Sequence, residues 1–111
     1  MTHSAKTHVL FVCSQNKLRS PTAAQVFAEH PGIVTDSAGT HRGAVVELCE
    51  EHILWADLIF VMEPAHRRRV QQKFRSQLTR QRLICLNIPD DYAFMAPALV
   101  SLLRKKVTPF L

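Results

Sequence analysis

Apolar residues along this chain form two kinds of pattern, short continuous runs and stretches with an apolar residue every three or four positions. Residues 9–13 and 58–62 are continuous apolar runs, which are typical of parallel strands buried on both faces. Shorter strands are predicted over 33–37 and 83–86. Helical spacing covers 21–30, 45–55, a segment that begins at Pro64, and 98–107. This alternation of strands and helices predicts an α/β fold with a four-stranded parallel sheet and right-handed crossovers.

Local signals indicate where several of these elements begin and end. Ser20 followed by Pro21 predicts a helix start, with serine as the N-cap and proline at the first helical position. Gly39 predicts a turn after the second strand, and Val45 opens the apolar stripe of the helix over 45–55. Residues 1–7 are polar and are expected to form a flexible tail. A chain of 111 residues supports one core, so residues 1–111 are expected to form a single domain.

A cysteine and an arginine stand six positions apart directly after the first strand, as Cys13 and Arg19. The five residues between them can curl into a loop whose backbone N–H groups all point at one anion. The positive end of the following helix faces the same loop, and this field also favours the thiolate form of a cysteine. Arg19 offers a planar fork for two phosphate oxygens. The spacing therefore predicts a phosphate-binding loop with Cys13 as its nucleophile.

The position of this loop in the predicted fold supports the same interpretation. In open α/β sheets ligands lie outside the carboxyl ends of the strands, and Cys13 ends the first strand. The plain alternative is a chance match, in which Cys13 is a small buried hydrophobic residue. Strand, cysteine, loop, arginine and capped helix follow one another in the order that phosphate chemistry needs, which favours the anion-binding interpretation.

Several segments resemble landmarks of the low-molecular-weight protein tyrosine phosphatases. They are VLFVC at 9–13 with Asn16 and RSP at 19–21, DSAGT at 36–40, ADLIFVM at 56–62 and IPDDY at 88–92. These segments follow the order that the family has, and they extend from about residue 8 towards the end of the chain. The resemblance implies a three-layer open sandwich whose parallel sheet has the strand order 2-1-3-4.

The resemblance also implies roles for the loop residues. Cys13 would form an S-phosphocysteine intermediate on an aryl phosphate or phosphotyrosine-type substrate. Asn16 would hold the unusual loop backbone, and the Ser20 hydroxyl would donate a hydrogen bond to the thiolate. An asparagine in a turn and a serine at an N-cap also occur without any catalytic reason. The predicted phosphate-binding set beside Arg19 is Ser14, Gln15, Asn16, Lys17, Leu18 and Ser20.

A phosphate monoester also needs a proton donor for its leaving oxygen, which should follow another strand at the same edge of the sheet. Asp90 and Asp91 come just after the last predicted strand. Alignment with the family's acid loop makes Asp90 the general acid and Tyr92 a wall beside the ring of the substrate. Asp91 stands where the family usually has proline and is the alternative donor. An aspartate pair after Pro89 is also a good turn former with no catalysis implied.

The loop departs from the family pattern in ways that affect the expected pocket. Gln15 stands where the family usually has glycine, and a positive φ there would strain a glutamine by about 1–2 kcal/mol. Leu18 replaces a common second cysteine, so Cys13 lacks an adjacent disulfide partner, and Lys17 adds positive charge at the rim. The segment between residues 40 and 56 is shorter than in the family. These departures predict a shallow, open pocket and leave room for a substrate other than a phosphotyrosyl protein.

The histidines and the remaining cysteines indicate no second site. His41 follows the DSAGT segment and is expected near the loop, where it could support Asn16. His66 falls on the apolar stripe of its helix and is expected at the edge of the core, and Cys49 and Cys85 are expected inside it. No cluster of histidine, cysteine and acidic residues has metal-ligand spacing. Neither a metal nor another cofactor is therefore expected.

Composition bounds the class of protein. Hydrophobic residues make up 47% and charged residues 21% of the chain, as in ordinary globular proteins. No apolar run approaches the roughly 20 residues that span a bilayer, and no signal-peptide pattern precedes the first strand. Three cysteines without metal-type spacing fit a reducing compartment. A cytoplasmic protein that does not contact a membrane is the expectation.

The net charge of +5 is unevenly distributed. Between Pro64 and Pro89 the sequence contains basic residues and no acidic one. This basic segment, 67–82, could bind an anionic partner such as nucleic acid, an anionic surface or a phosphorylated protein. The alternative is a solvated helix face. Its members are Arg67, Arg68, Arg69, Lys73, Arg75, Arg80 and Arg82.

Three functions are therefore compared. The first is a cysteine-dependent phosphatase of the protein tyrosine phosphatase type, with phosphate, sulfate or vanadate as further ligands of its site. The second is a catalytically weak or inactive module that binds phosphate or a phosphoprotein. The third is an arsenate reductase on the same fold, which normally needs a nearby pair of additional cysteines. Cys49 and Cys85 lie too far apart in the sequence to resemble such a pair.

Overall fold

The computed structural model describes residues 6–111 and contains one parallel sheet. The strands stand in the order β2-β1-β3-β4, which confirms the expected topology. They are β1 (Thr7–Cys13), β2 (Ile33–Gly39), β3 (Leu58–Val61) and β4 (Arg82–Cys85). The helices are α1 (Arg19–Val26), α2 (Glu50–Trp55), α3 (Pro64–Lys73) and α4 (Pro97–Val107), and a 3-10 turn follows at Thr108–Phe110.

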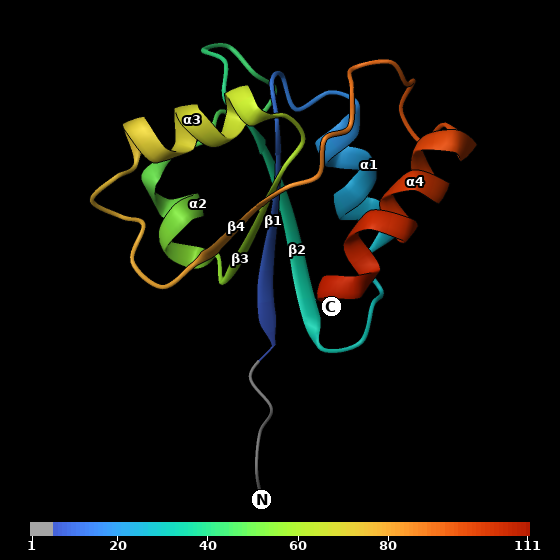
Figure 1. Cartoon of the computed structure of the whole chain (residues 1–111), viewed down its shortest axis with the longest axis horizontal. Coiled ribbons are helices and arrows are strands. Elements are labelled where there is room, and N and C mark those ends of the chain that lie inside the picture. The colour runs from blue at the N-terminus through green and yellow to red at the C-terminus, as the bar shows by residue number, and fades with distance from the viewer. Residues whose placement is uncertain (1–5) are drawn as a thin grey trace, which may run out of the picture.

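The helices cover both faces of the sheet and make the expected three-layer sandwich. Figure 1 shows α2 and α3 on one side of the sheet and α1 and α4 on the other. Because side chains alternate along a strand, Val9 and Phe11 pack in the core beneath α1 and α4. Leu10 and Val12 pack in the core on the face of α2 and α3. The central strand β1 is thus buried on both faces, as its continuous apolar run predicts.

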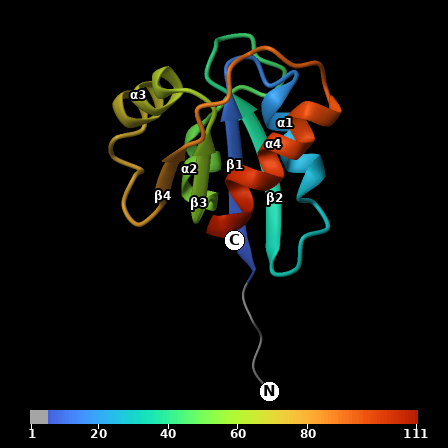
Figure 2. The ribbon, with the colours of Figure 1, turned by 45° about the vertical axis from the view of Figure 1, so that its right-hand side comes forward.

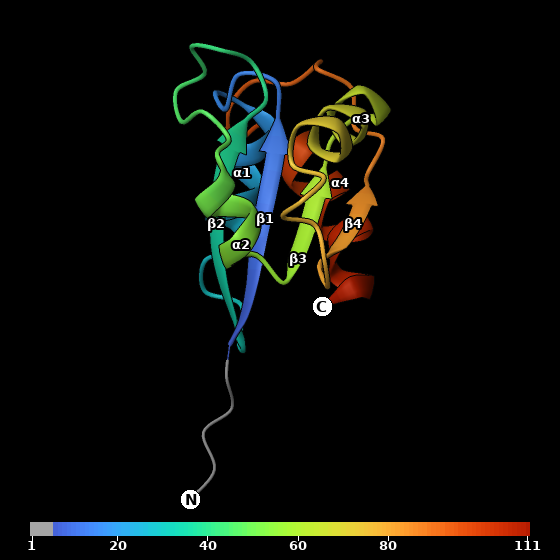
Figure 3. The ribbon, with the colours of Figure 1, turned by 90° about the vertical axis from the view of Figure 1, so that its left-hand side faces the viewer.

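All four strands run in the same direction, so their carboxyl ends share one edge. Figures 2 and 3 show the segments after β1, β2 and β4 gathered at that end of the molecule. This edge is where an open α/β sheet binds its ligands. Within residues 6–111, no helix has the length and apolar character needed to cross a membrane.

The expectations for the first residues need one correction. Residues 1–5 of the expected tail lie outside the described residues. Thr7 belongs to β1 and not to a tail, because it pairs with Ile33 and its N–H donates to Gly32 O at 2.9 Å. Pairing with β2 places Thr7 in the sheet, and the polar sequence around Thr7 does not predict this pairing.

Helix α1 begins earlier and ends earlier than predicted. It starts at Arg19, so Leu18 is the N-cap residue, and the expectation of Ser20 as N-cap is wrong. The Ser20 hydroxyl is engaged with Cys13 Sγ at 2.9 Å instead of with the helix end. The helix stops at Val26, before the predicted end at residue 30. Elsewhere the observed strands and α4 differ from the predicted bounds by one or two residues.

The predicted helix over 45–55 is half right. Only α2 is helical, and residues 45–48 run alongside the end of β2. The N–H of Gly39 donates to Val46 O and the N–H of Leu48 donates to Gly39 O, both at 2.8 Å. Val45, expected on a buried stripe, is 66% exposed. Gly39 itself ends β2 and is not a turn residue.

Candidate active site

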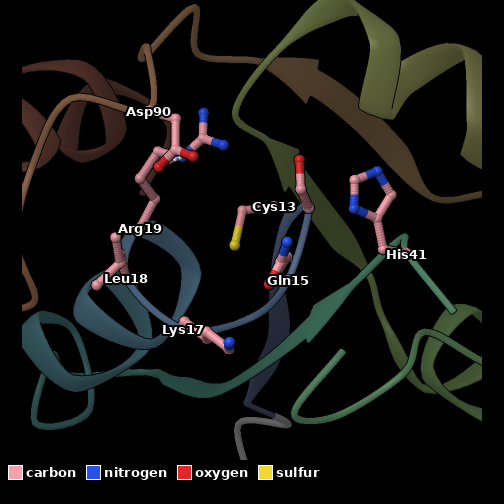
Figure 4. Close-up of a pocket in the computed structure, with 8 residues that line it drawn as sticks. Cys13, Gln15, Lys17, Leu18, Arg19, His41 and Asp90 are labelled. Atoms are coloured by element: carbon pink, nitrogen blue, oxygen red, sulfur yellow. Dashed lines mark ion pairs between the residues drawn. The ribbon is translucent and has the colours of Figure 1, made fainter. Parts of the chain in front are cut away.

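The segment between β1 and α1 curls around a cavity of about 270 Å³ at the carboxyl edge of the sheet. Figure 4 shows Cys13 and Gln15 on one part of this loop, with Arg19 and Asp90 on one side of the cavity and His41 on the other. Most of the predicted site residues therefore lie together. The lining residues are Cys13, Ser14, Gln15, Lys17, Leu18, Arg19, His41 and Asp90.

Three backbone carbonyls of the loop are fixed by the segment that follows β2. The oxygens of Cys13, Ser14 and Gln15 accept hydrogen bonds from the N–H groups of residues 40, 41 and 45, at 2.9, 2.9 and 3.0 Å. In a trans peptide the N–H points away from the C=O. The N–H groups of residues 14, 15 and 16 are therefore turned away from that segment. This is the arrangement of donors that binds an anion in a concave loop.

The thiol of Cys13 lies in a small network of hydroxyl and amide groups. Its Sγ is 2.9 Å from Ser20 Oγ. Asn16 Nδ2 donates to Ser20 Oγ and to Ser37 Oγ, each at 2.9 Å. Ser20 Oγ accepts from Asn16, so its own hydrogen can point at Cys13 Sγ, at 2.9 Å, or at Ala38 O, at 3.4 Å, and Cys13 Sγ is the nearer of the two acceptors. This geometry suits a hydroxyl that stabilises a thiolate, the role that the family resemblance implies for Ser20.

The strained position of the loop is Asn16 and not Gln15. Asn16 has a φ of 57°, whereas Gln15 is not among the residues with positive φ. Asparagine is one of the few non-glycine residues that tolerate this region. The departure from glycine at position 15 therefore carries no backbone penalty. Asn16 gains two side-chain hydrogen bonds in this conformation, and neither involves His41.

Gly39, at the end of β2, lets the loop approach the sheet closely. A Cβ at this position would lie 2.6 Å from Ser14 O, 2.7 Å from Ala44 Cβ and 2.9 Å from Asn16 N. Two of these three neighbours are backbone atoms of the loop, which cannot move aside without changing the loop. The glycine of the DSAGT segment therefore matters because it has no side chain, a role that the sequence did not predict.

Arg19 is buried and held from two sides. It is only 2% exposed, and its Nη1 donates to Glu63 Oε2 at 2.6 Å and to Ile88 O at 2.7 Å. Its Nε lies 3.6 Å from Asp90 Oδ1. These contacts fix the orientation of the Arg19 side chain in the wall of the cavity. Glu63, directly after β3, is a site residue that the sequence analysis missed, although a carboxylate at the carboxyl end of a buried strand is the same signal that identified Asp90.

The two candidate acids occupy different positions. Asp90 lines the cavity with a side chain that is 61% exposed, whereas Asp91 is exposed and is not a lining residue. Tyr92 is half-buried against the core beneath α1 and α4, and it too is absent from the cavity lining. The geometry thus favours Asp90 as the acid of the pair. The role of Tyr92 as a wall for the substrate remains a prediction.

Polar and charged groups form most of the rim. Lys17 and Gln15 are exposed lining residues, and Leu18 is the apolar one. His41 lies near the loop as expected, and its backbone N–H bonds Ser14 O. Figure 4 shows its ring on the side of the cavity away from Asp90.

A second contact joins the loop to helix α3. Ser14 Oγ lies 2.8 Å from Nε2 of His66, which is 3% exposed. Burial and the nearby Arg19 charge lower the pKa of His66 from 6.5 to about 4. His66 is therefore buried, as its place on the apolar stripe indicates, but it bonds a loop residue, which helical periodicity alone does not predict.

The basic segment 67–82 is partly tied to the protein. Arg67 donates to Leu83 O at 2.9 Å, and Arg80 pairs with Asp57 at 2.6 Å. Among residues 6–111, the remaining cations of α3 and its C-terminal end have no ion-pair partner. These cations are Arg68, Arg69, Lys73 and Arg75.

The other two cysteines do not reach the cavity. Cys49 precedes α2 and is partly exposed outside both core clusters, so the expectation that it lies in the core is wrong. Cys85 ends β4 and is partly buried, packed against the core on the face of α2 and α3. Neither is a lining residue. Within residues 6–111 no three histidine, cysteine, aspartate or glutamate side chains gather as a metal site would require.

Comparisons with known proteins give a clear likeness in structure. No protein-family model and no curated protein sequence matches the chain. A low molecular weight protein tyrosine phosphatase from T. tengcongensis matches with a TM-score of 0.74 and 21% identity, over 96% of this chain and 100% of that one. The YwlE arginine phosphatase from Geobacillus stearothermophilus matches with a TM-score of 0.65 and 22% identity, over 94% of each chain.

A third structure was determined with a ligand. Wzb from Vibrio vulnificus, in complex with benzylphosphonate, matches with a TM-score of 0.70 and 21% identity, over 96% of this chain and 97% of that one. The likeness in each case extends over almost the whole of both chains. The chain described here therefore has the fold of the low molecular weight protein tyrosine phosphatases.

Proposed function

We propose that this chain is a cysteine-dependent phosphomonoesterase that works through an S-phosphocysteine intermediate. The observation that carries the proposal is the 2.9 Å contact of Cys13 Sγ with Ser20 Oγ in a cavity that Arg19 and Asp90 also line. A nucleophile, a hydroxyl that stabilises its thiolate, a fixed cation and an acid are the groups that phosphoryl transfer needs.

In the first step the Cys13 thiolate attacks the phosphorus atom. The S–P bond forms as the P–O bond to the leaving group breaks, and the Asp90 carboxylic acid gives its proton to the leaving oxygen. Arg19 and the N–H groups of residues 14–16 hold the non-bridging oxygens, where negative charge is spread in the transition state. The products are the free alcohol and the phosphorylated cysteine.

In the second step a water molecule attacks the same phosphorus atom. The Asp90 carboxylate takes a proton from the water, the S–P bond breaks, and inorganic phosphate leaves. The hydroxyl of Ser20 stabilises the departing Cys13 thiolate by donating a hydrogen bond. The enzyme returns to its starting state, because the proton that Asp90 lost in the first step is replaced in the second.

The proposed substrate is an aryl phosphate or a phosphotyrosine side chain, in a small molecule or in a protein. Phosphoarginine is the second candidate, because one structure with the same fold is named as an arginine phosphatase. The rim supports both, since its exposed groups are polar or charged. Phosphotyrosyl and phosphoarginyl peptides of the same sequence, assayed side by side, distinguish the two substrates.

The proposal is tested by the turnover of a simple aryl phosphate by wild type and Cys13→Ser. Wild type should release phosphate and, after acid quenching, carry one phosphoryl group by intact mass. Cys13→Ser should lose all turnover. Cys85→Ser is the matched control, because this thiol is not in the cavity and its loss should leave the rate unchanged.

Other outcomes of this assay would contradict the proposal in distinct ways. Binding of phosphate without turnover by wild type would identify a phosphate-binding module. Turnover that survives Cys13→Ser would exclude covalent catalysis by this thiol. Reduction of arsenate with oxidation of a thiol would identify a reductase. Neither Cys49 nor Cys85 lines the cavity, so neither supports that function.

A further inference from the structure

The contact between Ser14 and His66 joins the loop to helix α3 in a defined hydrogen-bond direction. Ser14 Oγ and His66 Nε2 are 2.8 Å apart. The other ring nitrogen, Nδ1, lies 3.1 Å from the backbone N of Glu63, which donates to it. His66 thus occupies the third position of α3 and accepts a hydrogen bond from the N–H of Glu63, the N-cap residue of this helix.

The backbone N–H of Glu63 determines which nitrogen of His66 has the proton. An amide N–H can only donate, so Nδ1 must offer a lone pair. The neutral ring then has its single hydrogen on Nε2, which points at Ser14 Oγ. A second ring proton would have to sit on Nδ1, facing the Glu63 N–H, and would break the bond at the start of α3.

The groups around His66 keep its ring neutral near pH 7. Its burial and the charge of Arg19 disfavour the cation, as does His41, whereas Glu63 and Asp90 favour it. Burial and Arg19 prevail, and the pKa of His66 falls to about 4. The ring therefore donates to Ser14 over the whole neutral pH range.

The hydroxyl of Ser14 is left with a proton that His66 does not accept. Its oxygen accepts from His66, and within residues 6–111 the Ser14 hydroxyl has no other hydrogen-bond partner. Ser14 is partly buried and lines the same cavity as Cys13 and Arg19. An O–H group in that position can donate into the cavity.

We propose that the Ser14 hydroxyl is a further phosphate-binding donor, and that His66 positions it by occupying its acceptor side. The inference rests on the proposed function, since it assigns a side chain to the same phosphate site. Ser14 would contact a phosphoryl oxygen through its side chain, in addition to the backbone N–H of the loop. His66 would not touch the phosphate and acts only through Ser14.

The direct test is the affinity for inorganic phosphate, measured by titration calorimetry at about pH 7.5. A hydrogen bond to a charged group corresponds to about 10- to 100-fold in affinity, so Ser14→Ala should weaken phosphate binding by that factor. Ser14→Thr keeps a hydroxyl and should bind within a few-fold of wild type. Ser101→Ala, on the exposed side of α4, is the matched control and should change nothing.

A double-mutant cycle separates positioning by His66 from a merely structural role. His66→Leu removes both the donor to Ser14 and the acceptor for Glu63, and should weaken phosphate binding about 5- to 20-fold in the Ser14 protein. The same change should have almost no effect on phosphate affinity in the Ser14→Ala background. His66→Gln restores a donor and an acceptor, as glutamine does at this helix position, and should recover most of the affinity.

Each outcome either supports or overturns the inference. Ser14→Ala binding phosphate as tightly as wild type overturns it, as does an equal loss from His66→Leu in both backgrounds. Wild type that does not bind phosphate at all overturns it too. A wild type that binds phosphate but fails to turn over aryl phosphate contradicts only the proposed function, because the binding series is read without catalysis. Thermal unfolding of every variant identifies any that fails to fold, and Ser14→Thr and His66→Gln then decide the result.

Discussion

Two of the segments that line the cavity, the loop after β1 and the segment with Asp90, are held in very different ways. In the loop after β1, Cys13, Asn16, Arg19 and Ser20 are all buried, and every one of these side chains bonds a partner within the protein. The segment with Asp90 forms its backbone hydrogen bonds to other parts of the protein near its two ends, and Asp90 itself lies 3.6 Å from Arg19 Nε. The N–H of Ile88 donates to Met62 O at 2.8 Å and that of Met95 to Thr22 Oγ1 at 2.9 Å, whereas the acids between them are exposed.

This contrast separates two parts of the chemistry. The loop after β1 and the residues that hold it reach their geometry during folding. Changes there should therefore alter phosphate binding and turnover together. In the proposed mechanism, the segment of Asp90 adds a proton donor at the open side of this phosphate site. Changes there should alter turnover and leave phosphate binding almost unaffected. The predictions below test this division.

Apart from the loss of Cys13 itself, the largest effect is expected at Asp90. Asp90→Asn removes the proposed proton donor and should lower kcat for an aryl phosphate by about 10²- to 10⁴-fold. Affinity for inorganic phosphate should stay within a few-fold of wild type. Asp91→Asn is the matched control and should have little effect on either quantity. The reverse pattern in steady-state kinetics would assign the acid to Asp91.

A smaller effect on turnover, with an added effect on binding, is expected at Gly39. The new Cβ of Gly39→Ala would press on Ser14 O and Asn16 N. This overpacking should destabilise the protein by about 1–3 kcal/mol in urea unfolding and weaken phosphate binding about tenfold. Ala44→Gly should relieve only part of the loss, because two of the three crowded atoms belong to the backbone. Full rescue by Ala44→Gly would show that the loop itself is not displaced.

The pH dependence of stability should report the neutral state of His66. Its pKa is about 4 in the folded protein and near 6.5 when unfolded, so the unfolded chain binds more protons between these values. The stability that the protein gains by keeping His66 neutral is therefore fully present above about pH 6.5 and is lost as the pH falls towards 4. Arg19, Glu63, His41 and Asp90 are the charged or titratable groups that face the ring. Urea midpoints of His66→Gln should fall less steeply over this range, and an equally steep fall would assign the effect to other groups.

The smallest effect on the reaction itself is expected from the free cations at α3. Arg68→Glu with Arg75→Glu should change kcat/KM for a small aryl phosphate by less than about twofold, because salt screens exposed charges within about 8 Å. If the basic segment binds an anionic partner, kcat/KM for an acidic phosphopeptide should fall by a larger factor. Arg104→Glu with Lys105→Glu changes the net charge equally on α4 and serves as the control. Equal effects of the two pairs would indicate a solvated helix face.

Much of the fold was predictable because its signals are local. A continuous apolar run identified β1, and the six-residue spacing of Cys13 and Arg19 identified the loop. The position of Asp90 after the last strand placed it at the right edge of the sheet. Each inference used only a residue's neighbours in sequence and the rule that parallel strands end together.

The parts that could not be predicted depend on contacts between residues far apart in the chain. Residues 45–48 have the apolar spacing of a helix, yet their backbone forms hydrogen bonds with Gly39 at the end of β2. The partners of Arg19 come from the segment after β3 and from the segment after β4, which periodicity does not predict. Ser20 was expected to cap a helix and bonds Cys13 instead, because α1 begins at Arg19, two residues before the helix start that the capping rule predicts.

The anion site also has a consequence for folding. Folding brings the guanidinium of Arg19, the amino end of α1 and several peptide N–H dipoles to one point, where their positive ends repel one another. An anion bound there favours the native state over the unfolded chain by mass action. The melting temperature should therefore rise with the concentration of inorganic phosphate, and the chain would be most resistant to unfolding where the product of the proposed reaction accumulates.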